Sequence, residues 1–523
     1  MGKIFFNEDP NHFVFSRKKA GYRRITMEDA RNFILQYEGT QITDFFVCLG
    51  ASGSWYDSKN GDNIIETYKR WVSEGRTDDG EANLIVSSAR LVKDFYEAYG
   101  TSLQAVWLDA LREIGIHPWI SIRMNDIHEA GEKESILHSD FFRKNRDKNR
   151  VSHREPVGYY DYALDYMFPE VRAHYLDVIG EALGRFDVYG IELDFMREIY
   201  SIGVGREYEG IAVINAFMRS IYALVKEAEI RLGHEVKLAV RLPDTPEKAL
   251  RLGFDFFDWV EAGIVDCITV TPRWSSSDNH MPIDLWKKIL KDKNITLAAG
   301  QEILIDAYNR RGRVLQYNTY ETAIATACAH HFQGADAIYL FNYMDAPNPT
   351  GAVMTDDGRE FSLCLDGNIY KKFLQTAGDY ELAAASHRRH VVTYNDVDAI
   401  GVTTRKQLPL RLFGKRERAT GFSALRIATG KILPSQRVFV VLGFCGEEYQ
   451  KEDIRVFLNA KPCRLIAEQA SCAQQYPDMK YYRFEAENDG KMVPVAIIEV
   501  GLCEGRTELH WAEIEIKEME SED

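Results

Sequence analysis

The chain lacks the long apolar segments that place a protein in or across a membrane. No apolar run reaches the roughly 20 residues that span a bilayer, and the N-terminal segment Met1–Asp9 holds no stretch long enough for a signal-peptide core. The net charge of −15 also disfavours contact with nucleic acid or with an anionic membrane. We therefore expect a cytoplasmic protein with no nucleic-acid partner and no membrane partner.

The chain also lacks the short motifs that hold metals and cofactors. Its eight cysteines form no CxxC pair and no metal-ligand spacing. A Walker motif, a GxGxxG turn, an HExxH helix and a GxSxG elbow are all missing. We predict reduced thiols, no metal site and no cofactor.

What the chain does have is length and a globular composition rich in aromatic residues. At 523 residues it exceeds what one core usually supports, so two or three domains are expected. Hydrophobic residues make up 45% and charged residues 27%, the balance of an ordinary globular protein. The aromatic share of 12% suits a large core, and it also suits a cleft whose rings stack on sugars.

Short apolar runs alternate with amphipathic helical patterns through residues 1–377, which we predict to form a (β/α)₈ barrel, a TIM barrel. The predicted strands are His12–Ser16, Ile42–Cys48, Ile116–Ile122, Val188–Asp194, Val236–Arg241, Val265–Thr271, Ile295–Ala299 and Ala337–Asn342. The predicted helices are Met27–Tyr37, Ala82–Ala98, Leu103–Ile114, Val171–Phe186, Ile211–Leu232, Pro246–Ala262, Pro282–Leu290 and Tyr320–Phe332. Nearly continuous apolar strands are typical of a parallel sheet covered on both faces. An open doubly wound sheet is the alternative.

Residues 378–523 follow a different pattern and are predicted to form an all-β sandwich domain. Short strands succeed one another with turns or charged segments between them and no helical period. They are Val391–Tyr394, Ala399–Thr403, Leu408–Phe413, Ala424–Ile427, Arg437–Gly443, Ile454–Leu458, Tyr481–Phe484, Pro494–Val500 and Leu509–Ile516. Because exposed sheet faces need cover, the sandwich is expected to pack beside the barrel or to support a homo-oligomer.

Polar groups follow seven consecutive predicted barrel strands, although the strands themselves are apolar. In barrel enzymes the working residues lie at these strand ends and in the loops that follow. The segments are Leu49–Tyr56, Arg123–Glu129, Glu192–Arg197, Arg241, Thr271–Trp274, Gln301–Glu302 and Asn342–Asp345. This coincidence is the strongest functional signal in the sequence, and it predicts an active site at one mouth of the barrel.

Alternation along the fourth predicted strand points two carboxyl groups into the barrel. Glu192 and Asp194 share one face, while the apolar residues between them face the helices. An inward carboxyl group is costly unless it is paired or used. Asp194 lies at the rim and is predicted to be catalytic. Glu192 lies deeper, and the alternative for it is an internal ion pair with Arg123 or Arg241.

Glu302, at the end of the seventh strand, is predicted to face Asp194 across the mouth. Glycoside hydrolysis needs two carboxyl groups beside the scissile bond, one as acid and the other as nucleophile or base. Positive neighbours should keep Asp194 ionised, and desolvation should suit Glu302 to be the acid. Alternatively, Glu302 only forms a salt bridge with Arg273. Asp126 is a third candidate acid, or else part of a turn or helix cap.

Other residues at the same mouth offer donors, acceptors and rings suited to a sugar. We predict that the carbohydrate substrate is bound by Arg123, Asn125, Asp126, His128, Glu192, Arg197, Arg273, Trp274, Trp55 and Asn342. For each tryptophan the alternative is a place in the core, where single aromatic residues are more often found.

Three segments resemble the family-10-like glycosyl hydrolases, barrel proteins known mainly as hypothetical glycosidases. Tyr189–Arg197 resembles their DGIELDWMR-type fourth strand, Ile120–Asp126 their third-strand motif, and Gln333–Asn342 their eighth strand. Gly378 begins a segment similar to the one that leads into their C-terminal sandwich. The resemblance covers residues 10–390 and is specific as a set of motifs.

This resemblance implies a glycosidase-type barrel that acts on a carbohydrate without a cofactor. The family's aspartate falls on Asp194 and its arginine on Arg197, whereas Glu302 rests on strand geometry. Two alternatives stay open. A metal-assisted lyase or isomerase, or a transglycosylase, would use the same mouth, and a metal would need three carboxylates from Asp126, Glu192 or Asp194, and Glu302. A non-catalytic carbohydrate-binding protein could instead hold its sugar on the sandwich.

Overall fold

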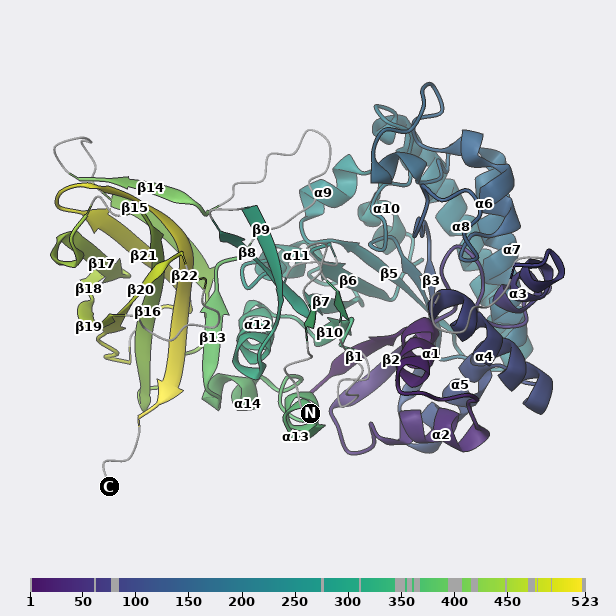
Figure 1. Ribbon diagram of the computed structural model, residues 1–523, viewed down its shortest axis with the longest axis horizontal. Coiled ribbons are helices and arrows are strands. Elements are labelled where there is room, and N and C mark those ends of the chain that lie inside the picture. The colour runs from purple at the N-terminus through teal and green to yellow at the C-terminus, as the bar shows by residue number, and fades with distance from the viewer. Residues whose placement is uncertain are drawn as a thin grey trace.

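A barrel and a sandwich of antiparallel sheets make up the computed structural model of the chain (Figure 1). The described residues are 2–60, 63–76, 84–273, 277–309, 312–343, 353–354, 360–361, 367–393, 407–414, 422–446, 449–468, 476, 478–490 and 492–519. Within these ranges no helix has both the length and the apolar character needed to cross a membrane.

Eight parallel strands close into a barrel, which confirms the predicted (β/α)₈ architecture and rules out the open sheet. In order of hydrogen-bonded neighbours they are β1 (Ile4–Glu8), β10 (Ala337–Phe341), β7 (Thr296–Glu302), β6 (Cys267–Thr271), β5 (Lys237–Pro243), β4 (Gly190–Asp194), β3 (His117–Arg123) and β2 (Ile42–Cys48). Arg123 of β3 is in register with Asp194 of β4, which is in register with Arg241 of β5. These three side chains therefore start at one level of the mouth.

Helices surround the strands (Figure 1). They are α1 (Pro10–Lys19), α2 (Met27–Leu35), α3 (Ile64–Ser73), α4 (Leu84–Tyr99), α5 (Leu103–Glu113), α7 (Pro169–Arg185), α8 (Glu207–Leu232), α9 (Pro246–Arg251), α10 (Phe256–Glu261), α11 (Ile283–Ile289) and α12 (Tyr320–Gln333). Between β3 and α7 the chain makes a long excursion, residues 124–168, which holds α6 (Asp140–Lys144) and the 3₁₀ turns η1 (Arg146–Lys148) and η2 (Tyr159–Tyr162). The predicted helices did not include α3 or the elements of this excursion.

The first predicted strand, His12–Ser16, is wrong, because that segment lies inside helix α1. The true first strand is Ile4–Glu8, all of which is buried. Asp9 caps the helix by accepting a hydrogen bond from the Asn11 backbone N–H at 3.0 Å, and a proline at the next position is suited to the first helical turn. A short apolar run does not by itself distinguish a buried strand from a buried helix turn.

Side chains fill the interior of the barrel. Phe46 stacks on Trp119 at a ring distance of 4.9 Å and lies 5.4 Å from the ring of Tyr339. Gly190 is required on β4 because a Cβ atom there would lie 2.3 Å from the Trp119 ring. Beyond this packed layer the inward positions of β4 become polar only toward its C-terminal end, at Glu192 and Asp194.

Two antiparallel sheets form the C-terminal sandwich, as predicted. The larger has β13 (Arg388–Val391), β22 (Arg506–Glu518), β16 (Gln436–Cys445), β20 (Lys480–Ala486) and β19 (Arg464–Glu468) in order, with β14 (Leu410–Phe413) also paired to β22. The smaller has β15 (Phe422–Ala428), β21 (Val495–Leu502), β17 (Ile454–Leu458) and β18 (Lys461–Pro462). Their facing residues, such as Val440, Ile498 and Ile514, form a separate core. The predicted strand Ala399–Thr403 lies outside the described residues.

Several segments connect the two parts. A hairpin of β8 (Leu304–Asn309) and β9 (Gly312–Tyr317) projects between β7 and α12, and its Ile305 packs in one cluster with Trp511 of β22. Helix α12 packs against β13 and against α14 (Tyr380–Ala385), which follows α13 (Gly367–Leu374). A domain boundary after residue 377 stays a prediction. Two further short strands, β11 (Val353–Met354) and β12 (Glu360–Phe361), pair with each other.

Candidate active site

The C-terminal ends of the barrel strands carry a set of carboxyl groups and arginines that are almost completely buried. This is the end of a (β/α)₈ barrel at which active sites form. The groups fall into three clusters, centred on Arg241, on Arg123 and on Arg273.

Arg241, on β5, holds the two predicted catalytic carboxyl groups in one cluster. Its Nη1 donates to both carboxylate oxygens of Asp194, at 3.1 and 3.0 Å, and its Nη2 lies 3.6 Å from Oε1 of Glu302. The guanidinium also lies 3.8 Å above the Phe341 ring. Arg241 and Glu302 have no exposed surface and Asp194 is 1% exposed. Strands β4 and β7 are thus linked across the mouth through a residue of β5.

Asp194 also determines the path of the loop that follows β4. Its Oδ1 accepts hydrogen bonds from the backbone N–H groups of Met196 at 2.8 Å and Arg197 at 3.1 Å. Bonds of this kind from an aspartate to its own following backbone form a tight turn. Asp194 is thus fixed at the end of its strand by the following loop on one side and by Arg241 on the other.

Glu302 lies against Asn342 rather than against the predicted alternative partner. Asn342 follows β10 in a left-handed conformation with φ of 62°, and its Nδ2 donates to Oε2 of Glu302 at 3.1 Å. Arg273 instead pairs with Glu198, at 3.2 Å. A simple Glu302–Arg273 salt bridge is therefore not what the structure contains. A non-glycine residue in this backbone region is uncommon and is found where surrounding contacts hold it.

Glu192 lies one layer deeper than Asp194 and is fully buried. Its Oε1 accepts hydrogen bonds from the hydroxyls of Ser121, at 2.7 Å, and Tyr339, at 2.9 Å. Burial, reinforced by the negative charge of Asp194, raises the pKa of Glu192 to about 7. Hydroxyl groups thus replace the direct arginine partner that the sequence suggested, and contact of Glu192 with a substrate stays a prediction.

A second cluster links the ends of β1, β3 and β4. Arg123 donates to Asp9 at 2.5 Å and to Asp126 at 3.0 Å. The His128 ring lies between Asp126, whose Oδ1 is 2.7 Å from Nδ1, and Arg197, which donates to Nε2. Burial alone would raise the pKa of Asp126, but its contacts with His128 and Arg123 outweigh burial and hold that pKa well below its usual range. Asp126 is therefore poorly suited to be a general acid.

Two predicted substrate-binding residues, Asn125 and Trp55, make their contacts within the protein itself. Both N–H groups of the Asn125 side chain donate to backbone carbonyls, those of Leu164 and Tyr200, each at 2.9 Å, and its oxygen accepts from the Leu164 N–H at 2.9 Å. Trp55 is 1% exposed and packs edge-on against Phe15, so it cannot stack on a sugar. The alternative, a place in the core, is correct for Trp55. Trp274 lies outside the described residues.

A third cluster contains residues that the sequence reading did not single out. Glu198 accepts a hydrogen bond from the Tyr159 hydroxyl at 3.0 Å and pairs with Arg273, whose guanidinium lies 5.0 Å from the Tyr160 ring. Glu198 is 1% exposed, whereas Tyr159 is 43% exposed. Burial raises the pKa of Glu198 against the opposing charges of the nearby arginines. Its place four residues after Asp194, in the loop that follows β4, is the signal that could have identified Glu198.

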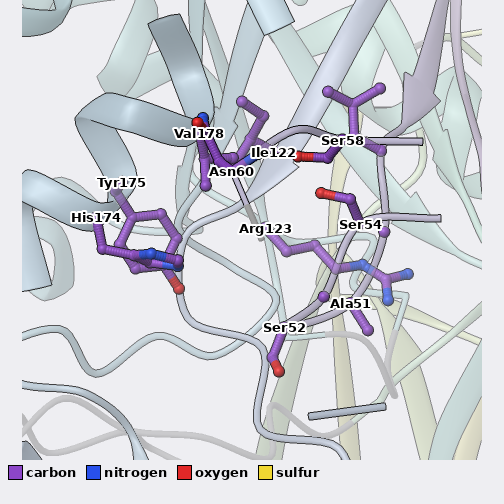
Figure 2. Close-up of a pocket in the computed structure, with 13 residues that line it drawn as sticks. Ala51, Ser52, Ser54, Ser58, Asn60, Ile122, Arg123, His174, Tyr175 and Val178 are labelled. Atoms are coloured by element: carbon purple, nitrogen blue, oxygen red, sulfur yellow. Dashed lines mark hydrogen bonds between the residues drawn. The ribbon is translucent and has the colours of Figure 1, made fainter. Parts of the chain in front are cut away.

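A small pocket lies beside the second cluster. Figure 2 shows it between the loop that carries Ser52 and Ser54 and the helix that carries His174 and Tyr175, with Arg123 in the wall. Its volume is about 40 Å³, which is room for a few water molecules and not for a sugar ring.

The carboxyl groups of the mouth do not assemble into a metal site within the described residues. No group of three histidine, cysteine, aspartate or glutamate side chains there is placed to share one ion. The three carboxylates that a metal-assisted reaction would need are Asp126, Glu192 or Asp194, and Glu302, and arginines contact Asp126, Asp194 and Glu302. A cation would have to displace those guanidinium groups.

Comparison with known proteins finds no relative in sequence: no family model matches the chain, and no curated protein matches it. Solved structures with a similar arrangement include a cycloisomaltooligosaccharide glucanotransferase from Paenibacillus sp. (10% identity, 98% of this chain and 57% of that one, TM-score 0.32). They also include a family GH18 chitinase from Chromobacterium violaceum (9% identity, 97% and 91%, TM-score 0.38) and a chitinase from Bacillus thuringiensis (8% identity, 96% and 98%, TM-score 0.37). At these values the likeness carries no conclusion about what this chain does.

Proposed function

We propose that the chain is a glycoside hydrolase that uses Asp194 and Glu302 as its two working carboxyl groups. The observation that carries this proposal is that these residues, from β4 and β7, both contact the single guanidinium of Arg241. A glycosidase needs two carboxyl groups that flank one bond, and a shared rigid partner keeps such a pair at a constant separation. The resemblance of Tyr189–Arg197 to the family-10-like hydrolases supports the same assignment.

In this proposal Asp194 is the nucleophile or base. It accepts two backbone N–H bonds and two bonds from Arg241, which together fix its carboxyl group at the end of β4. Glu302 is the acid, with Asn342 orienting its Oε2. We propose retention of configuration, which corresponds to carboxyl groups about 5–5.5 Å apart, whereas inversion corresponds to about 6.5–9.5 Å.

The test is a screen of aryl glycosides and natural oligosaccharides with the wild type, Asp194→Asn and Glu302→Gln. Each variant should lower kcat on a true substrate by about 10³-fold or more, because each removes one half of the acid–base or nucleophile pair. Asp109→Asn, a change at an exposed surface aspartate, serves as the matched control and should keep wild-type kcat.

Near-normal turnover by Asp194→Asn would overturn the proposal. Near-normal turnover by Glu302→Gln alone would transfer the acid role to another residue. Glu198 is then the next candidate in preference to Asp126, because burial raises the pKa of Glu198 while the neighbours of Asp126 lower its pKa.

A further inference from the structure

The excursion between β3 and α7 contains a cavity of about 580 Å³ that is separate from the three clusters of the mouth. Its walls come from the segment between Gly131 and Tyr162 alone. A volume of about 300–1,000 Å³ is typical of sites that bind small molecules. The size of this cavity therefore matches a ligand larger than water or a simple ion.

Backbone bonds hold the walls of the cavity in place. Asn149 forms an isolated bridge with Leu164, and the Arg150 N–H donates to the Ala163 carbonyl at 2.8 Å. The Asp161 carboxylate accepts from the Val157 N–H, at 2.9 Å, and from the Arg154 guanidinium, at 2.8 Å. A ligand would meet a wall that is already formed and would lose little affinity to ordering it.

Several polar groups in the cavity wall are available to a ligand. Among the described residues, the exposed side chains of Lys133, His153 and Glu155 form no hydrogen bond or ion pair with the rest of the chain. The Arg146 guanidinium lies 5.4 Å from the Tyr162 ring, and its Nη1 is buried without a hydrogen-bond partner in the same part of the chain. A buried N–H group without a partner is costly, so a ligand oxygen that accepts from it would be favoured.

The wall carries charges of both signs. Lys133, Arg146 and Arg154 are cationic and Asp147 and Glu155 are anionic, while Arg154 is paired with Asp161 and Asp147 lies 3.8 Å from Lys148. An anionic ligand would be repelled by the carboxylates, and a cationic ligand by the lysine and arginines. Donors and acceptors that lie side by side on one wall suit a ligand that carries many hydroxyl groups and no charge.

We propose that this cavity binds a stretch of a neutral oligosaccharide, as a subsite beyond the mouth of the barrel. The choice of a sugar rests on the proposed function, whereas the requirement for an uncharged polyhydroxyl ligand rests on the wall itself. Tyr162 adds a ring against which the C–H face of a sugar can pack. The same excursion also carries Tyr159, whose hydroxyl donates to Glu198 at the mouth. One segment of the chain therefore contributes to both the cavity and the third cluster.

The test is calorimetric titration of the full chain, in the Asp194→Asn background so that no bond is cleaved. The probes are maltotetraose, cellotetraose, xylotetraose and chitotetraose, with tetragalacturonate as the anionic comparison. At least one neutral probe should bind, and tetragalacturonate should bind at least about tenfold more weakly. The combined variant Lys133→Ala, His153→Ala and Glu155→Ala should raise the Kd of the neutral probe at least about tenfold.

The matched control is Lys144→Ala with Glu170→Ala, two exposed residues nearby that do not line the cavity. It should leave the Kd unchanged, and thermal unfolding should show that both combined variants are folded. Absence of binding by every neutral probe, an unchanged Kd in the cavity variant, or tighter binding of tetragalacturonate would each overturn the inference. Failure of the proposed function would appear differently, as wild-type protein that binds a probe in the cavity and never cleaves it.

Discussion

At the scale of single residues, the mouth of the barrel buries more carboxyl groups than cations around Arg241. Three buried carboxyl groups, those of Glu192, Asp194 and Glu302, interact with the single guanidinium of Arg241. Burial of three negative charges beside one positive charge is costly, so more than one of these groups is expected to keep a proton. Glu192 is one of them, because it lies deepest and hydroxyls rather than a cation contact it directly. The proposed acid, Glu302, would be the other.

Stability should therefore depend on pH through Glu192. Folding raises the pKa of this carboxyl group from its ordinary 4.5 to about 7, so its stabilising contribution is complete below pH 4.5 and is lost as the pH rises through 7. Glu192→Gln stays neutral at every pH. Between pH 5 and pH 8 the wild type should lose about 2.5 kcal/mol of unfolding free energy relative to this variant.

Urea unfolding across that pH range measures the difference, with the exposed Glu209→Gln as the control. Parallel stability curves for the wild type and Glu192→Gln would show that Glu192 titrates in the folded protein as it does in the unfolded chain.

At the scale of elements, the excursion between β3 and α7 depends on one side chain, that of Asn125. Its amide joins the end of β3 to Leu164 within the excursion and to Tyr200 in the loop after β4. This amide thus aligns the two loops that supply the second and third clusters. A residue predicted to hold substrate is instead a clamp between loops.

Replacement of this clamp should cost stability. Asn125→Ala removes three hydrogen bonds and leaves buried backbone groups without partners, so it should lower the unfolding free energy by about 2–4 kcal/mol. Limited proteolysis should then cut the excursion sooner. Asn145→Ala, which removes a single bond within α6, is the control and should cost about 1 kcal/mol or less. Equal losses in the two variants would contradict the clamp.

At the scale of the whole molecule, the barrel and the sandwich meet at a contact that leaves no room for a side chain. Gly430 follows β15 with φ of 68°, and a Cβ atom there would lie 2.7 Å from Sγ of Cys328 on α12. A Cβ atom on Gly490, whose φ is 72°, would lie 3.6 Å from Pro434, the nearest atom among the described residues. Both glycines have a left-handed backbone conformation, but only Gly430 lies at the contact between the sandwich and α12 of the barrel.

These two positions separate the cost of the contact from the cost of the backbone. Gly490→Ala should lower the unfolding free energy by about 1–2 kcal/mol, the cost of a left-handed conformation. Gly430→Ala should cost a further ~1–3 kcal/mol because the methyl group forces α12 and the sandwich apart. Denaturant unfolding of both variants measures the increment. Equal destabilisation would mean that Cys328 moves aside without cost.

The sequence by itself determined the architecture, because that depends on local signals repeated many times. Alternating apolar strands and amphipathic helices established the barrel, and turn-separated strands established the sandwich. Alternation along β4 also placed Glu192 and Asp194 inward, since side chains on a strand point to opposite faces in turn. The prediction of a strand at His12–Ser16 was wrong because an apolar run of five residues is compatible with either a strand or a helix.

Only the tertiary structure decided which groups touch. Arg241 contacts Asp194 and lies beside Glu302, and Arg273 pairs with Glu198. Asn125 forms its hydrogen bonds with backbone groups. All of these contacts depend on distances between chain segments that are far apart in sequence. The burial of Trp55 and the raised pKa of Glu192 follow from the same packing. Residue types at strand ends predict where chemistry can occur, whereas three-dimensional contacts decide which of those residues remain free for it.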